Sequence, residues 1–181
     1  VWIDAVPQLT GANIPFVIRL RVVLLRDTGA PLAPFNAWQI IQGLETVGLR
    51  MKQHCSNAEK VVTFLETQKK VQNVIYPTNH QGEIKERALK YMKGGYGSLV
   101  GMDVGTKENG AKFIDNLKML YHVANIGDAR SLAIHPATTT HSQLNDKELL
   151  AAGVTPGYVR LSIGIEHPDD IIADIKQALA A

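Results

Sequence analysis

Arg160 is the residue whose type and setting most clearly predict chemistry. It lies in the segment VRLSIGIE, residues 159–166, where apolar and polar residues alternate. A period of two is typical of a strand that buries one face and turns the other toward polar surroundings. A guanidinium on the polar face is either solvated at a sheet edge or binds an anion, because its fork of donors matches a carboxylate in bidentate fashion. The residues alone leave both alternatives open.

Other residue types that often carry chemistry have no matching spacing. His135 and His141 lie in one threonine-rich segment, but neither has the paired Cys/His ligands or the His-Glu helix motif of zinc sites. A structural role is therefore favoured for both, and no metal is expected. A Ser-His-Asp hydrolase is disfavoured too, because the sequence contains no strand–Gly-x-Ser-x-Gly–helix turn to expose a nucleophile.

The single cysteine and the glycines also have structural explanations. Cys55 falls on an apolar helical stripe, where a small thiol is expected to fill core space. Gly95, Gly97 and Gly101 invite a dinucleotide-binding interpretation, but that fingerprint needs a strand before the glycines and a helix after them. Here the predicted helix comes first. The glycines therefore predict a helix-to-strand turn.

Composition excludes several classes of protein. The chain has 181 residues, 45% hydrophobic and 20% charged, with 19 basic and 17 acidic side chains and a net charge of +2. A balanced charge without basic clusters argues against a nucleic-acid partner, and no apolar run approaches the roughly 20 residues of a membrane span. One cysteine and the lack of a signal-like start favour a cytoplasmic protein. Because the first residue is Val1, we expect a longer gene product.

The elements that must position these residues follow from periodicity. Apolar spacing predicts helices over 16–28, 35–66, 84–92, 114–124 and 168–179, and strands over 71–76, 98–104, 131–134 and 159–165. A bend is expected at Gly43 or Gly48, and Asn145 with Glu148 forms a capping box for a further short helix. This order predicts an α/β (α+β) fold, with helices packed on one face of a small, mostly antiparallel sheet.

Several strings together resemble the Cys/Met-metabolism family of pyridoxal-phosphate enzymes. They are GLET (43–46) with LRM (49–51), ANIGD (124–128), IHPA (134–137) with TTHSQL (139–144), and VRLSIGIE (159–166). The resemblance begins near Leu20 and implies the C-terminal domain of a fold-type I enzyme. It implies a linker or inter-domain segment at 1–33 and the C-terminal domain at 34–181. The N-terminal cofactor-binding domain, with its Schiff-base lysine, is not found in this sequence.

The resemblance also implies roles for residues. Arg160 matches the arginine that grips the α-carboxylate of the substrate, and Ser131 matches a serine that lines the same pocket. Asn125 and residues 139–141 are expected to pack or to form the pocket wall. No catalytic, cofactor-binding or metal-binding residue is expected in this chain, so pyridoxal phosphate would be bound by the full-length enzyme and not by this part alone.

The implied reaction replaces the acetyl group of O-acetyl-L-homoserine with sulfide or a small thiol, giving homocysteine. The full-length enzyme is expected to be a homo-oligomer. Two alternatives stay open: a cystathionine-forming or cystathionine-cleaving member of the same family, and a non-enzymatic assembly module.

Overall fold

Residues 15–181 are described by the computed structural model, and contacts divide the chain after Thr46 into two units. In the first unit the described residues form α1 (Pro15–Arg19), the π-helical turn η2 (Leu20–Leu25), α2 (Arg26–Thr28) and α3 (Pro34–Glu45). The predicted stop at Gly29 is confirmed, because Gly29 has a left-handed φ of 63°, which favours a residue without a Cβ. Residues 1–14 of the predicted linker lie outside the described range, and the domain boundary at 33–34 stays a prediction.

The second unit alternates helices with short strands. Its helices are α4 (Val47–Glu66), α5 (Gly82–Tyr91), α6 (Lys107–Asp115), the 3-10 turn η3 (Pro136–Thr138), α7 (Asp146–Ala151) and α8 (Pro168–Ala180). The predicted long helix over 35–66 is divided at Thr46, between Gly43 and Gly48, where α3 ends and α4 begins. Within residues 15–181, no helix combines the length and apolar composition needed to cross a membrane.

The strands form one sheet in the order β1-β2-β5-β4-β3. They are β1 (Asn73–Ile75), β2 (Leu99–Asp103), β3 (Tyr121–His122), β4 (Leu132–Ile134) and β5 (Tyr158–Ser162). The neighbouring strands are antiparallel except β3 and β4, so the predicted, mostly antiparallel sheet is confirmed. β5 lies in the centre, and its Arg160 faces Gly101 of β2 on one side and Ile134 of β4 on the other.

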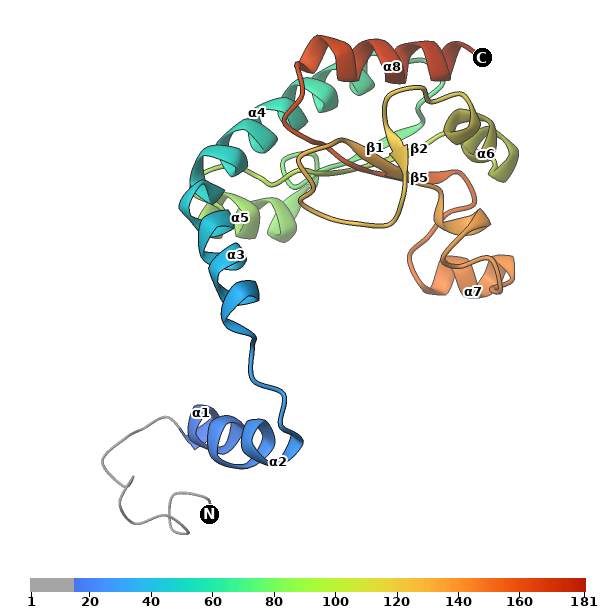
Figure 1. The fold of residues 1–181 in the computed structure, drawn as a ribbon. Coiled ribbons are helices and arrows are strands. Elements are labelled where there is room, and N and C mark those ends of the chain that lie inside the picture. The colour runs from blue at the N-terminus through green and yellow to red at the C-terminus, as the bar shows by residue number, and fades with distance from the viewer. Residues whose placement is uncertain (1–14) are drawn as a thin grey trace. The chain divides into compact units, whose positions relative to one another are not determined.

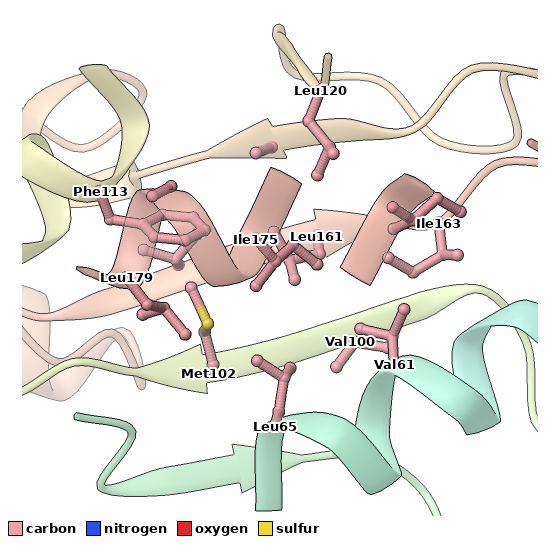
Figure 2. Packing of buried hydrophobic residues seen from close by; sticks show 14 of the residues in the cluster. Val61, Leu65, Val100, Met102, Phe113, Leu120, Leu161, Ile163, Ile175 and Leu179 are labelled. Atoms are coloured by element: carbon pink, nitrogen blue, oxygen red, sulfur yellow. The ribbon is translucent and has the colours of Figure 1, made fainter. Parts of the chain in front are cut away.

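Helices α4 and α8 cover one face of this sheet (Figure 1). Figure 2 shows their side chains meeting those of β2 and β5. The alternation in β5 places Val159, Leu161 and Ile163 in this core with no exposed surface. Burial of each such side chain stabilises the fold by about 1.5–3 kcal/mol. One face of β5 is therefore fixed in the core, and the opposite face can carry a side chain that binds a ligand.

The predicted helix over 114–124 is wrong beyond Asp115, and the helix observed here begins earlier, at Lys107. α6 ends at Asp115, and Tyr121 lies in β3. The reason is a distant contact: the carboxylate of Asp174 on α8 accepts hydrogen bonds from the backbone amides of Lys118, Met119 and Leu120 at 2.8–2.9 Å. These amides would otherwise continue the helix, and the carboxylate redirects them into a turn.

Candidate functional site

Arg160 projects from the centre of β5 on the face opposite to the core. Its side chain is partly buried, and its Nη2 donates to the carbonyl oxygen of Asn125 at 3.4 Å. Its Nε is buried and has no hydrogen-bond partner in the described part of the chain. Among residues 15–181 no carboxylate lies within ion-pair distance of this guanidinium. A desolvated donor without an acceptor costs free energy, so the site favours an incoming anion.

A groove of about 370 Å³ runs beside Arg160, between β1, β2, β5 and α5. Its wall is mostly apolar, with Ile84 and Met92 among its residues, and Arg160 is the only Lys or Arg among the described residues that line it. A single cation in an apolar wall suits an amphipathic monoanion better than a multiply charged ligand. Helix α5 thus flanks the sheet face that carries the arginine.

Tyr158 forms the part of this wall next to Arg160 and depends on a glycine. A Cβ added to Gly101 would lie 2.7 Å from Cε2 of the Tyr158 ring. The absence of a side chain at Gly101 therefore lets the ring lie across β2. Burial raises the pKa of the Tyr158 phenol, and the nearby charge of Arg160 offsets only part of that rise. The phenol is neutral at physiological pH, so Arg160 supplies the charge of this wall.

Ser131 lies just before β4 and is completely buried. Its hydroxyl donates to Glu166 Oε2 at 2.8 Å, and its backbone N–H donates to Glu166 Oε1 at 2.6 Å. The amide of Gly164 in turn donates to Ser131 Oγ at 2.8 Å. Ser131 is not among the residues lining the groove beside Arg160. The predicted place of Ser131 in the pocket wall stays a prediction. Its hydroxyl proton is already donated to the Glu166 carboxylate.

Two residues of α4 that the sequence analysis did not single out join the same polar group. His54 and Asn57 are 1% and 0% exposed and bind the backbone of the turn after β5. The signal that could have found them is the i, i+3 spacing of two polar residues beside an apolar helical stripe. Buried polar groups of this kind are normally satisfied by specific partners.

The remaining candidates from the sequence have structural surroundings. His135 is buried, with Nδ1 3.0 Å from Thr138 Oγ1 and Nε2 2.8 Å from the carbonyl oxygen of Pro156. Burial lowers its pKa, although the Pro156 carbonyl opposes that effect. Cys55 is buried on α4. No cluster of His, Cys, Asp and Glu suited to a metal ion is found in the described part of the chain.

Comparison with known proteins identifies the family. A family model described as Cys/Met metabolism PLP-dependent enzyme matches residues 10–180. The chain belongs to this family. It is 50% identical over 171 residues to the O-acetyl-L-homoserine sulfhydrylase of Leptospira meyeri, covering 93% of this chain and 39% of that protein. It is 41% identical over 177 residues to the homocysteine/cysteine synthase of Saccharomyces cerevisiae, covering 92% of this chain and 40% of that protein.

A solved structure gives the same result for the fold. The crystal structure of a putative O-acetylhomoserine (thiol)-lyase from Campylobacter jejuni matches with a TM-score of 0.84 and 44% identity. The match covers 92% of this chain and 40% of that protein. The chain thus spans about two fifths of the length of these members of the Cys/Met-metabolism family, and the predicted family and fold class are confirmed.

The residues of this chain do not fit the cofactor of the family. In the Campylobacter jejuni structure a lysine carries the pyridoxyl group. Every lysine in the described range is exposed or only partly buried, whereas a Schiff-base lysine is activated by desolvation in a pocket. We therefore assign no cofactor-binding residue within 15–181.

Proposed function

We propose that this chain is the carboxy-terminal, substrate-orienting part of an O-acetylhomoserine sulfhydrylase. Residues 34–181 would form the domain and residues 1–33 the segment that leads into it. The full-length enzyme would replace the acetyl group of O-acetyl-L-homoserine with sulfide or a small thiol, giving homocysteine and acetate. The names of the relatives support this reaction. We further propose a cytoplasmic homo-oligomer, in keeping with the single cysteine.

The observation that carries the proposal is the guanidinium of Arg160, which has no carboxylate partner among residues 15–181. Its Nε is buried without an acceptor, and the groove beside it is largely apolar. A carboxylate would satisfy the fork of donors, while the aliphatic part of an amino acid would lie against the apolar wall. Arg160 would thus hold the α-carboxylate and fix the orientation of the substrate.

The contribution of this chain to the reaction is positional. Holding a substrate in the reactive geometry lowers the barrier by restricting its motion before the chemical step. When it is bound by the rest of the enzyme, pyridoxal phosphate supplies the electron sink. Ser131 is proposed as a residue near the substrate because of its match to the family, and its hydrogen bonds to Glu166 connect it to the turn that follows the strand bearing Arg160.

The test is the substitution Arg160→Ala in the full-length protein that contains this chain. Loss of a buried, bidentate carboxylate contact costs about 2–5 kcal/mol, so KM for the amino acid substrate should rise at least thirtyfold. Arg87→Ala is the matched control, because Arg87 is exposed and pairs with Glu83 on the same helix. The absorbance of bound cofactor should not change. Kinetics like those of the control would remove Arg160 from the site.

The cofactor assignment and the choice of acceptor have separate tests. Borohydride reduction of pyridoxal phosphate mixed with residues 1–181 should label no lysine specifically, and stoichiometric labelling of one lysine would contradict the proposal. Offering sulfide and cysteine to the full-length protein distinguishes a sulfhydrylase from a cystathionine-forming enzyme. Turnover with cysteine alone would favour the latter.

A further inference from the structure

A buried polar cluster surrounds the turn at 163–166, immediately after β5. We call it the exit clamp, and its side chains come from His54 and Asn57 on α4, Ser131 before β4, and Glu166 in the turn itself. His54, Asn57 and Ser131 are at most 1% exposed. The clamp therefore joins three segments that are far apart in the sequence, at the end of the strand that bears Arg160.

The α4 side of the clamp binds backbone carbonyls. His54 Nδ1 lies 2.6 Å from the carbonyl oxygen of Ile163. Because a carbonyl can only accept, Nδ1 carries the proton and donates it. Asn57 Nδ2 donates to the carbonyl oxygens of Gly164 at 3.0 Å and Glu166 at 2.8 Å. These contacts hold the backbone of the turn against α4 at three carbonyls, those of Ile163, Gly164 and Glu166.

The β4 side binds the same turn through one carboxylate. Glu166 accepts from both donors of Ser131, and the amide of Gly164 donates to the Ser131 hydroxyl oxygen. A Cβ at Gly164 would lie 2.3 Å from Glu166 Oε2 and 2.5 Å from the carbonyl oxygen of Ala129. The absence of a side chain at Gly164 therefore leaves the space that the Glu166 carboxylate occupies.

We propose that His54, Asn57 and Glu166 are positioning residues for Arg160. The clamp locks the end of β5 to the start of β4, and Arg160 is paired with Ile134 between these two strands. Apart from His54 Nε2, the polar side-chain groups of the clamp have hydrogen-bond partners among the described residues, and such a network is rigid because each group is costly to leave without a partner. Displacement of a binding group by about 1 Å can lower kcat/KM about a hundredfold. This inference rests on the proposed role of Arg160 in binding the substrate.

The sharpest test compares two substitutions at one position in the full-length enzyme. In His54→Asn the side-chain amide nitrogen takes about the place of Nδ1, so the bond to Ile163 can form. In His54→Gln the amide reaches the place of Nε2, which has no partner in the structure. Both lose the imidazole ring. We expect KM within about threefold of wild type for Asn, and a rise of at least about tenfold for Gln with a smaller change in kcat.

A second test asks whether Glu166 acts through Arg160. Glu166→Gln places an NH₂ group against one of the two Ser131 donors, and KM should rise about tenfold or more. Glu148→Gln is the matched control, because that carboxylate is exposed and accepts a hydrogen bond from the amide of Asn145, outside the exit clamp, so the change should leave KM within about twofold. In an Arg160→Ala background the further effect of Glu166→Gln should nearly vanish, as expected of coupled residues.

The outcomes separate the two proposals. An unchanged KM in Arg160→Ala overturns the proposed function and the clamp with it. A raised KM in Arg160→Ala combined with wild-type KM in both His54→Gln and Glu166→Gln overturns only the clamp. So does a full multiplication of the Glu166 and Arg160 effects, which would show that the two act independently. If Glu166→Gln does not fold, the contrast between the two His54 variants decides.

Discussion

Replacing Asp174 with Asn should destabilise the fold, because it removes a buried carboxylate that accepts several hydrogen bonds. Oδ1 accepts from the amide of Lys118 at 2.9 Å and from Gln177 Nε2 at 3.0 Å. Oδ2 accepts from the amides of Met119 and Leu120 at 2.8 and 2.9 Å. Whichever way a carboxamide turns, its NH₂ group faces two of these four donors, which then lose their acceptor.

The size of the effect follows from those lost hydrogen bonds. A hydrogen bond to a charged group contributes about 1.5–3 kcal/mol, so two weakened contacts should cost about 3 kcal/mol. For a chain of this size each kcal/mol lowers Tm by roughly 2–4 °C, which predicts a decrease of about 6–12 °C. The same contacts hold the turn that follows α6. Because the variant weakens them, the amides of residues 118–120 should exchange with solvent faster in the variant.

The effect should depend on pH. Burial alone would raise the pKa of Asp174, but the amides of Leu120, Lys118 and Met119 and the Gln177 side chain together hold it below the ordinary 3.8. The unfolded chain therefore takes up a proton at a higher pH than the folded chain does. The stabilisation is complete well above pH 3.8 and is lost as the pH falls through that value toward the folded-state pKa.

Thermal unfolding followed by circular dichroism at pH 7 and at about pH 3 checks both parts of this prediction. Asp115→Asn is the control, because Asp115 is exposed and removal of its charge should change Tm by about 2 °C or less. Equal Tm values for the two variants at pH 7 would refute the reasoning. A difference between them that is undiminished at low pH would refute the assignment of the pKa.

Two other substitutions test steric and capping arguments. Gly164→Ala should destabilise by about 2 kcal/mol or more in urea unfolding, because the added Cβ meets backbone atoms of Ala129, whereas Gly48→Ala, with open space around it, should be neutral or stabilising. Asn145→Ala should cost about 1 kcal/mol and speed hydrogen exchange at the amide of Glu148, because it removes the acceptor of that N–H; unchanged exchange would contradict the capping argument.

The elements predicted well from the sequence are those that local chemistry determines. The capping box of Asn145 and Glu148 begins α7, and Pro168 occupies the first turn of α8. Both depend on groups within three residues of one another. The alternation in 159–163 likewise assigns the two faces of β5, because side chains of a strand point to opposite sides whatever their partners are. The position of Arg160 on the polar face was therefore predictable.

The failures have a common physical cause in contacts between distant residues. The apolar spacing at 114–124 continues a helical pattern, and only Asp174 on another helix ends it after Asp115. The exit clamp shows the same limit, because His54 binds a backbone carbonyl at Ile163 that carries no signature in the sequence. A buried polar side chain can be suspected from its helical position, but its partner depends on the packing of α4 against the sheet.

The two faces of β5 separate stability from binding. Val159 and Leu161 are fully buried in the core that also holds residues of α4 and α8, whereas Arg160 lies on the opposite face. A strand anchored on one face and held at its end by the exit clamp can carry a guanidinium whose donors are incompletely satisfied. Burial of the apolar core offsets the free-energy cost of those unsatisfied donors. A ligand that pairs with them therefore gains affinity without any need to order the strand. Pre-organisation of this kind is what a residue dedicated to orienting a substrate requires.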